Sequence, residues 1–467
     1  MASTKTQPAR GMRDFMPADV RRREYVIGVI RDVYERYGFE PLETPAVENI
    51  ETLMGKYGEE GNQLIFKILK RGVHEATGEA DLALRYDLTV PLARVVAEYR
   101  DRLPNYFKRY QIQPVWRADR PARGRFREFY QCDVDVLGST SMVVETEICA
   151  AAAEVLTKLG FNDFIVRLNH RKALTGILAV AGLALEHHDA ALVTLDKLDK
   201  IGREGVDKEF AARGIPEGAR FRLLDFFTTL SSLEHAADLA AGEDLEIRQT
   251  ALNKAILGRI VEFVGDNELG AAGVEELRAI IEFGDAMCIT RHLCIDPTLA
   301  RGLSYYTGSI MEINVKDLPG SLGGGGRYDN LVGMFSGQDI PACGFSLGLE
   351  RILIVMNERE MFPSTIVTRS ADVLIAALDE EFLPEALVIA GELRAGDLRV
   401  FFYPDASRKP QKPLSYADAQ QIPVVVLIGE NEHGTGTVTV RNLLTRTQDR
   451  IVRQDAAGFV RQTIAGM

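Results

Sequence analysis

Hydrophobic residues recur at helical spacing after Pro17. Positions three or four residues apart are apolar or aromatic, as on one face of a helix: Val26, Ile27, Ile30, Val33, Tyr34 and Tyr37. A proline suits the first turn of a helix, and Gly38 suits the position just after its end. The pattern predicts an amphipathic helix over residues 17–38, followed by an extended edge segment over 39–47, which contains two prolines.

Aromatic and β-branched residues dominate two later stretches, 106–116 and 126–136, which predicts two β-strands. The stretch between them, 119–125, contains a proline and a glycine, which are typical of turns. We therefore expect a hairpin with a long basic loop. An alanine-rich stretch over 145–159 then predicts a further helix.

Residues 172–290 differ in kind, because apolar residues recur there at helical spacing and strand patterns are nearly absent. This pattern predicts a helical insertion. Strand-like stretches resume at 309–315 and 342–347. Beyond a polar stretch at 362–370, strand and helix patterns alternate, which predicts a small α/β domain at the end of the chain.

The composition is that of an ordinary folded protein of several domains. Of the 467 residues, 46% are hydrophobic and 26% are charged, which excludes a disordered or collagen-like chain. A formal net charge of -12 excludes a protein that is basic over its whole surface and binds nucleic acid everywhere. No apolar run approaches the ~20 residues of a membrane-spanning helix, and the first residues lack a signal-peptide pattern. We therefore expect a cytoplasmic protein with no membrane partner.

The five cysteines form no CxxC pair, and the seven histidines show no HExxH spacing. We expect reduced thiols and no metal-ligating residues. Cys132 and Cys343 lie in strand-like stretches, where core packing is the expected role and reactivity or metal binding is the alternative.

Positive charge is concentrated in residues 100–127, which contain nine basic and two acidic residues, a local charge of 9 − 2 = +7. The planar guanidinium group of arginine suits phosphate oxygens, so a polyanionic ligand is one interpretation. A solvated loop whose arginines pair with nearby carboxylates is the other. Five arginines lie in or beside the expected loop: Arg117, Arg120, Arg123, Arg125 and Arg127.

The strand expected over 126–136 has one polar face. Side chains alternate between the two faces of a strand, so these residues share one side: Arg127, Phe129, Gln131, Asp133 and Asp135. An ordinary exposed strand can look the same. The adjoining arginine-rich loop favours a ligand-binding face.

Two short segments combine polar groups that suit an amino-acid ligand. Asp87 and Thr89 lie two residues apart and could receive an ammonium group, or Asp87 could cap the helix that follows. The run LARGLSYYTG at 299–308 combines an arginine, two tyrosines and two glycines, as in the wall of a pocket.

Two glycine-containing segments suggest phosphate chemistry to different degrees. The run GGGGRYD at 323–329 lacks the ending of a P-loop and indicates only a tight, adaptable loop. The segment 344–351 is expected to be a strand that enters a helix, with Arg351 in the first helical turn. An arginine is electrostatically unfavourable there unless an anion binds, which favours a phosphate site.

Taken together, five separated stretches resemble the motifs of class II aminoacyl-tRNA synthetases. The first helix and the segment at Pro45 resemble motif 1, residues 107–138 resemble motif 2, and residues 344–351 resemble motif 3. The runs at 299–308 and 323–329 are similar to the two histidine-specific signatures of histidine–tRNA ligases, and all five occur in the order of that family.

The resemblance implies an α+β catalytic domain with an antiparallel sheet, over 1–171 and 291–361. It implies a helical insertion over 172–290 and a C-terminal α/β anticodon-binding domain over 371–467. The implied reaction joins L-histidine and ATP into histidyl-adenylate and pyrophosphate, then transfers the histidyl group to the 3′ end of tRNA(His). Mg²⁺ would be bound with the ATP, and motif 1 implies a homodimer.

The resemblance also implies roles for individual residues. These would bind ATP, with the arginines on the phosphates and the aspartate and phenylalanine at the adenine: Arg117, Arg351, Arg125, Asp119 and Phe126. Asp87, Thr89 and Gln131 would bind the α-amino group of histidine. The imidazole pocket would contain Asp135, Tyr305, Tyr306 and Tyr328.

Arg301 would be catalytic together with Arg117 and Arg351. It would contact the α-phosphate and the substrate carboxylate, where other enzymes of the class use a metal ion. A fixed guanidinium can stabilise the charge that builds up when a carboxylate attacks a phosphate.

An inactive paralogue that regulates ATP phosphoribosyltransferase is the alternative. Such paralogues lack the anticodon-binding domain and usually degrade the two signatures, whereas both signatures and the last hundred residues are present here. The sequence departs from many bacterial members at three positions. Asp87 and Asp135 replace glutamates, and Ser304 stands where aspartate is frequent.

Overall fold

The computed structural model describes residues 6–466 apart from 73–76, 196, 242–243, 301–304, 317, 364–365 and 367–368. The chain forms two compact units, Met1–Phe362 and Pro363–Met467. The boundary lies within the polar stretch that the sequence showed near residue 362. The predicted division of the first unit into catalytic and helical parts stays a prediction.

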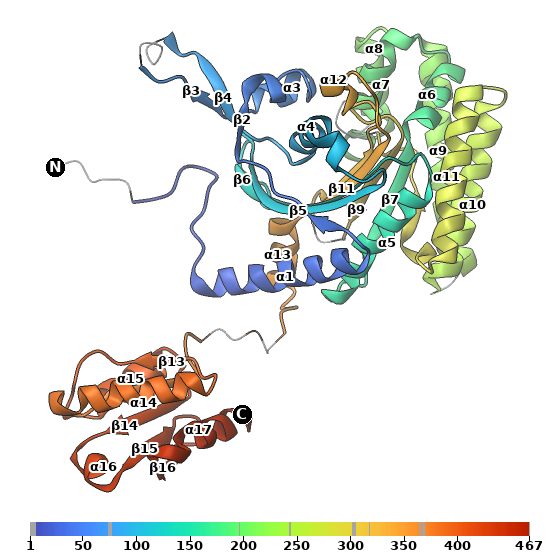
Figure 1. The fold of residues 1–467 in the computed structure, drawn as a ribbon. Coiled ribbons are helices and arrows are strands. Elements are labelled where there is room, and N and C mark those ends of the chain that lie inside the picture. The colour runs from blue at the N-terminus through green and yellow to red at the C-terminus, as the bar shows by residue number, and fades with distance from the viewer. Residues whose placement is uncertain are drawn as a thin grey trace. The chain divides into compact units, whose positions relative to one another are not determined.

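An eight-stranded sheet forms the centre of the first unit (Figure 1). In spatial order the strands are β1 (Glu40–Pro41), β5 (Phe107–Trp116), β6 (Glu128–Leu137), β11 (Ala342–Gly348), β10 (Ser321–Arg327), β9 (Ser309–Asn314), β7 (Ile165–His170) and β8 (Leu293–Ile295). Neighbours are antiparallel from β5 to β7, and only the two outermost pairs are parallel. The predicted antiparallel sheet is confirmed, and Pro41 lies on an edge strand, where a missing N–H is tolerated.

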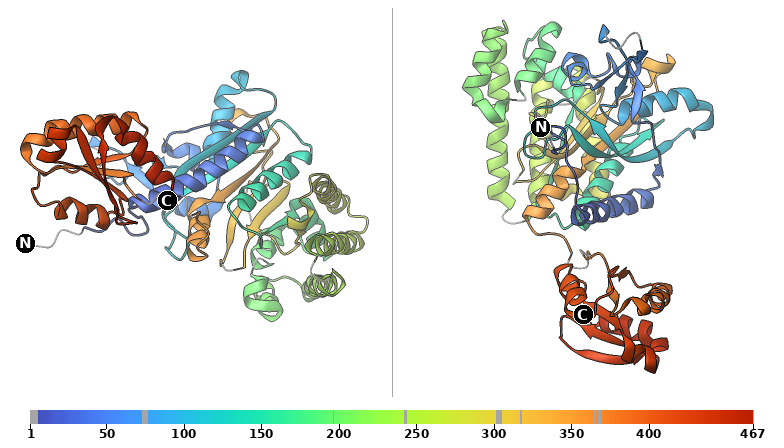
Figure 2. Two further views of the ribbon diagram at one scale, coloured as in Figure 1. Left: turned by 90° about the horizontal axis from the view of Figure 1, so that it is seen from below. Right: turned by 90° about the vertical axis from the view of Figure 1, so that its left-hand side faces the viewer.

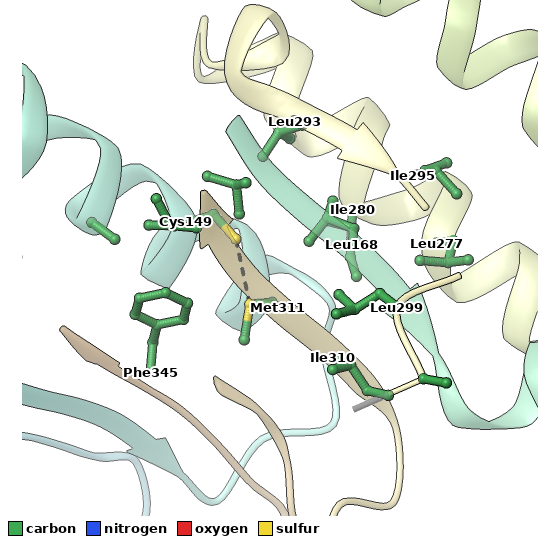
Figure 3. Packing of buried hydrophobic residues seen from close by; sticks show 14 of the residues in the cluster. Cys149, Leu168, Leu277, Ile280, Leu293, Ile295, Leu299, Ile310, Met311 and Phe345 are labelled. Carbon is green, nitrogen blue, oxygen red and sulfur yellow. Dashed lines mark hydrogen bonds between the residues drawn. The ribbon is translucent and has the colours of Figure 1, made fainter. Parts of the chain in front are cut away.

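One face of this sheet is apolar and covered by helices. The helices α1 (Pro17–Arg36), α5 (Val143–Lys158) and α13 (Leu349–Glu358) lie on this side, as Figure 1 shows below the strands. Figure 3 shows Phe345 and Met311 of the sheet packing near Cys149 of α5, whose thiol contacts the Met311 sulfur at 3.4 Å. Burial of these apolar side chains fixes which face of each strand remains for a ligand.

The other face carries polar side chains and is partly covered by a second layer. The helices are α2 (Ile50–Leu53), α3 (Gly58–Gln63), α4 (Thr89–Tyr99) and α12 (Gly333–Ser336). Beside them lies a three-stranded sheet of β2 (Val47–Asn49), β4 (Ala80–Leu84) and β3 (Lys67–Leu69). The sequence pattern did not predict these three short strands.

Helices fill residues 171–286 at one end of the large sheet, as predicted (Figure 2, green to yellow). They are α6 (Arg171–Val180), α7 (His188–Leu195), α8 (Leu198–Ala212), α9 (Glu217–Ala241), α10 (Leu245–Val264) and α11 (Glu268–Ala286). Figure 3 shows Leu277 and Ile280 of α11 beside Leu168 of β7, within one apolar cluster. His170, which is fully buried, contacts the Glu276 carboxylate at 2.6 Å. The helices therefore share the core of the sheet.

The second unit is a five-stranded mixed sheet with helices on both faces. Its strands, in spatial order, are β13 (Val400–Phe402), β12 (Val373–Ala377), β14 (Val424–Ile428), β15 (Thr437–Asn442) and β16 (Gln448–Val452). Its helices are α14 (Leu383–Ala395), α15 (Gln411–Ala419), α16 (Glu430–Thr435) and α17 (Ala456–Ala465). Alternate residues of β12 pack on opposite sides, with Ile375 towards α14 and Leu374 towards α15. The predicted α/β domain is confirmed.

The glycine run at 323–326 corrects one prediction. It forms the middle of strand β10 and not an adaptable loop. A Cβ atom on Gly325 would overlap the carbonyl oxygen of Gly344 and lie 2.9 Å from a ring carbon of Phe345. Glycine is required at Gly325 because the neighbouring strand and an aromatic ring occupy the space of a side chain.

Candidate active site

A cavity of about 440 Å³ opens on the polar face of the large sheet. The predicted site residues that the structure describes all line it: Asp87, Thr89, Arg117, Asp119, Arg125, Phe126, Gln131, Asp135, Tyr305, Tyr306, Tyr328 and Arg351. Arg301 and Ser304 lie outside the described residues. Residues from far apart in the sequence therefore meet in one cavity, although nothing in their spacing required it.

Asp87 is almost completely buried and bonded on both carboxylate oxygens. Tyr57 donates a hydrogen bond to its Oδ1 at 2.9 Å, and Tyr305 donates to its Oδ2 at 3.2 Å. The backbone N–H of Val90 also donates to Oδ1 at 3.0 Å. Asp87 therefore bonds to the first turn of α4, as the capping alternative expected, and it also lines the cavity, while its contact with an ammonium group stays a prediction. Burial raises the pKa of Asp87, and the N–H of Val90 opposes that rise.

Asp135 lies between two partners at the other side of the cavity. Tyr328 donates a hydrogen bond to its Oδ1 at 2.5 Å, and the Arg109 guanidinium lies 2.8 Å from its Oδ2. The Arg109 side chain is 0% exposed. Gly344 stands opposite Asp135 on β11, where a Cβ atom would overlap the carboxylate. The sequence reading missed Arg109, although it shares a strand face with Gln111 and Gln113.

Asp133 lies between Gln131 and Asp135 on the same face of β6. Its side chain lines the cavity and is only 3% exposed, and the Arg109 guanidinium lies 3.9 Å from its Oδ2. Burial raises the pKa of Asp133 to about 7, the Arg109 guanidinium opposes that rise, and the Asp135 carboxylate adds to it. The amide of Gln131 donates to the Ser346 hydroxyl at 2.9 Å. These strand positions are thus buried, and not an exposed polar face.

Three tyrosines from the two runs that resemble histidine-specific signatures form an aromatic wall of the cavity. Tyr305 contacts Tyr306 edge to face at a centroid distance of 5.2 Å, and contacts Tyr328 at 5.9 Å. Such contacts fix ring orientation beyond simple area burial. Two of these tyrosines also bond to the carboxylates, Tyr305 to Asp87 and Tyr328 to Asp135.

Two arginines of the predicted phosphate site, Arg117 and Arg351, are held by backbone or aromatic groups. The Arg117 guanidinium lies over the Tyr86 ring at 4.3 Å and donates to the Tyr86 carbonyl at 3.0 Å. Arg351 donates from Nε to the Gly124 carbonyl at 3.2 Å and from Nη1 to the Ser321 carbonyl. α13 begins at Leu349, so Arg351 lies in its first turn as predicted.

The basic loop also contains pairs with carboxylates, as the second interpretation of its charge expected. Arg125 lies 2.9 Å from Asp119, and Arg123 pairs with Glu358. The Arg123–Glu358 pair is exposed on both sides and contributes about 0–1 kcal/mol. In the other pair Asp119 is buried, but Arg125 is exposed and can turn towards another anion. Carboxylate pairing in this structure is therefore compatible with phosphate binding by Arg125.

The ring of Phe126 makes a cation–π contact with Arg13, which the sequence did not predict. The Arg13 guanidinium lies 3.4 Å from the ring centroid and 3.8 Å from the carboxylate of Glu350. Glu350 lines the cavity and accepts a hydrogen bond from the Tyr130 N–H at 2.9 Å. Burial raises the pKa of Glu350 to about 7. The N-terminal segment thus reaches the expected adenine site.

Two of the cysteines, Cys132 and Cys343, have the packing role that was expected. Cys132 and Cys343 are buried and unbonded to each other, and burial raises the pKa of both thiols. Within the described part of the chain, no three His, Cys, Asp or Glu side chains are grouped to hold a metal ion. No helix of that part is long and apolar enough to cross a membrane.

An antiparallel sheet flanked by helices, with arginines and carboxylates on its open face and a separate α/β unit, defines a class II aminoacyl-tRNA synthetase fold. The sequence model for histidyl-tRNA synthetase matches residues 11–352, and the model for the anticodon binding domain matches 372–463. The chain belongs to the histidyl-tRNA synthetase family. The resemblance and the fold class inferred from the sequence are thereby confirmed.

Individual relatives agree. The histidine–tRNA ligase of Porphyromonas gingivalis is 41% identical over 97% of this chain and 98% of its own, and that of Gloeobacter violaceus is 40% identical over 98% and 97%. The crystal structure of histidyl-tRNA synthetase from Nostoc sp. PCC 7120 superposes with a TM-score of 0.78 at 29% identity, covering 99% of this chain and 100% of that one. The enzyme from S. aureus, at 19% identity and a TM-score of 0.66 over 98% and 100%, shares the fold.

Proposed function

We propose that this chain is a histidine–tRNA ligase, which activates L-histidine with ATP and transfers the histidyl group to the 3′ end of tRNA(His). The observation that carries the proposal is that residues of both histidine signatures and of motifs 2 and 3 line one cavity. Membership of the family and the 41% identity to a histidine–tRNA ligase over nearly the whole chain support it.

Histidine would bind at the carboxylate side of the cavity. Asp87, Thr89 and Gln131 would receive its α-amino group, because carboxylate, hydroxyl and amide oxygens accept hydrogen bonds from an ammonium. Asp135 would accept a hydrogen bond from the imidazole N–H, and Arg109 and Tyr328 would hold Asp135 in place. Tyr305 and Tyr306 would pack against the imidazole ring.

ATP would bind at the arginine side. Arg117 and Arg351 would hold the phosphates, and Arg125 would exchange Asp119 for a phosphate oxygen. Phe126 would stack on the adenine ring, with Asp119 near the adenine amine. The carboxylate of Glu312 lines the cavity and fits the one or two protein ligands that Mg²⁺ takes beside phosphates. Bound Mg²⁺ would supply positive charge to the departing pyrophosphate.

Activation needs no proton transfer. A carboxylate oxygen of histidine attacks the α-phosphorus, an O–P bond forms, and the bond to the bridging oxygen of pyrophosphate breaks. The negative charges of the attacking and leaving groups converge in the transition state, where fixed cations act most strongly. Arg301 would supply one at the α-phosphate and Arg117 another, so these residues would be catalytic with Arg351.

The second unit would bind the anticodon of tRNA(His), and two copies of the chain would form a homodimer. The match of residues 372–463 to an anticodon binding domain supports the first part. Light scattering of the purified chain tests the second, since a monomer at working concentration would contradict it.

ATP–pyrophosphate exchange, measured with each of the twenty amino acids, tests the proposal. Exchange with histidine and with no other amino acid is expected. The inactive regulatory paralogue would give no exchange and would instead bind an ATP phosphoribosyltransferase. No exchange with histidine would therefore refute the ligase assignment.

A further inference from the structure

Two neighbouring side chains of β6 present unsatisfied acceptors to the cavity. Within the described part of the structure, Gln131 Oε1 and Asp133 Oδ1 accept no hydrogen bond, and both atoms are buried from solvent. Gln131 is 9% exposed and Asp133 is 2% exposed. A buried acceptor without a donor destabilises the fold, so such a pair facing a cavity indicates a ligand that donates hydrogen bonds.

The charges around these acceptors indicate that the donor is a cation. Three carboxylates face this part of the cavity, those of Asp87, Asp133 and Asp135. The buried Arg109 guanidinium lies 2.8 Å from Asp135 but 3.9 Å from Asp133. Asp87 is bonded to the neutral hydroxyls of Tyr57 and Tyr305. Arg109 thus pairs closely with Asp135, and Arg117 acts on Asp87. Asp133 is the more distant partner of Arg109, and the Ser346 hydroxyl, a neutral group, lowers its pKa.

We propose that Asp133 is a further substrate-binding residue, whose Oδ1 accepts a hydrogen bond from the α-ammonium group of the amino-acid substrate. An ammonium group has three N–H donors, and Asp133 adds a charged acceptor to those of Asp87, Thr89 and Gln131, which line the same cavity. The inference rests on the proposed function, because it assigns a contact within the histidine site. It extends the roles implied by the family resemblance, which left Asp133 without one.

A structural role for Asp133 is the competing explanation. In that case Asp133 would serve only as a second carboxylate beside Arg109, and its loss would loosen Asp135 as well. The Asp133 mutation would then weaken the binding of every ligand that carries an imidazole, whether or not it has an amino group. The two explanations differ in whether the effect of the mutation requires an ammonium group on the ligand.

The test compares L-histidine with 3-(imidazol-4-yl)propionate, which differs only in lacking the amino group. Dissociation constants are measured by calorimetry, with competition for the weaker ligand, for the full-length wild-type chain and for Asp133→Asn. We expect histidine to bind about 10- to 100-fold more weakly to Asp133→Asn, as for the loss of a hydrogen bond to a charged group. The propionate should change less than twofold. Asp163→Asn is the matched control, because Asp163 pairs with Arg359 away from the cavity.

Other outcomes overturn the proposal. Equal weakening of both ligands, or no weakening of histidine, would exclude an ammonium contact. If Asp133→Asn does not fold, Asp133→Ser carries the same comparison, and failure of both variants to fold would make Asp133 structural. A wild-type chain that binds histidine while Asp133→Asn binds it equally well refutes only this inference. A wild-type chain that binds no histidine refutes the proposed function itself.

Discussion

Substitutions at two adjacent glycines of β10 test the packing of the sheet and the occupation of the cavity independently. Gly324 and Gly325 point to opposite faces of the same strand. A Cβ atom on Gly324 would meet only the carbonyl oxygen of Met311 at 3.5 Å, an ordinary contact, and would enter the space above the polar face. A Cβ atom on Gly325 would overlap the Gly344 carbonyl and lie 2.6 Å from the Phe345 Cα.

The two alanine variants should therefore have opposite effects. Gly324→Ala should leave the melting temperature unchanged or slightly higher, because alanine restricts the unfolded chain by about 0.4–1 kcal/mol where its conformation fits. Gly325→Ala should destabilise the first unit by about 2–3 kcal/mol, since backbone atoms cannot move aside. These values predict a difference of about 3 kcal/mol between neighbouring substitutions.

Gly324→Ala should lose catalytic activity although it keeps its stability. Gly324 pairs with Ser346, which pairs with Asp133, so the added methyl group would enter the proposed histidine site. We expect kcat/KM for histidine in ATP–pyrophosphate exchange to fall at least about tenfold, equivalent to ~1.4 kcal/mol. An unchanged kcat/KM would show that substrate does not occupy this space. Equal loss of stability in both variants would refute the assignment of the two faces.

Three further predictions concern single charged groups. Arg109→Met should destabilise the first unit by about 3–5 kcal/mol, because Asp133 and Asp135 lose their buried cation, and thermal unfolding beside an Arg109→Lys control would measure this. Glu276→Gln should lower stability at pH 7 by about 1–2 kcal/mol, because His170 and Lys172 lower the pKa of Glu276 to about 2 in a partly exposed site. The stabilisation is complete above the pKa of unfolded Glu276, near 4.5, and disappears as the pH falls towards 2. The stabilities of wild type and variant should therefore become equal in acid, and a constant difference in stability from pH 7 to pH 2 would contradict this. Arg301→Ala should slow adenylate formation at least about 100-fold with an unchanged melting temperature, whereas an unfolded variant would make Arg301 structural.

The elements with regular side-chain patterns were predictable from the sequence. The helix α1 and the strands β5 and β6 lie where their side-chain patterns predicted them, because each element buries one continuous apolar face. β10 was not predictable, because a strand of glycines carries no alternation to read. Its glycines are set by contacts with β11, which only the folded chain provides.

The site shows the same division. Residues with a recognisable family motif, such as Asp87 and Arg117, were identified and line the cavity. Arg109 was not identified, because a charged residue on a strand is usually exposed. Only the structure shows that its side chain is buried and lies beside Asp135. Arg13 reaches Phe126 through the fold alone. Sequence patterns thus identify the residues that carry a family motif more readily than the residues that hold them in place.

Aminoacylation of unfractionated tRNA with labelled histidine tests the central proposal most directly. The purified chain, with ATP and Mg²⁺, should attach histidine to tRNA, and the Arg301→Ala variant should give only background under the same conditions. Histidine attached at the wild-type rate by both chains would contradict the proposed catalytic role of Arg301. No attachment of histidine by a folded wild-type chain would contradict the assignment as a histidine–tRNA ligase.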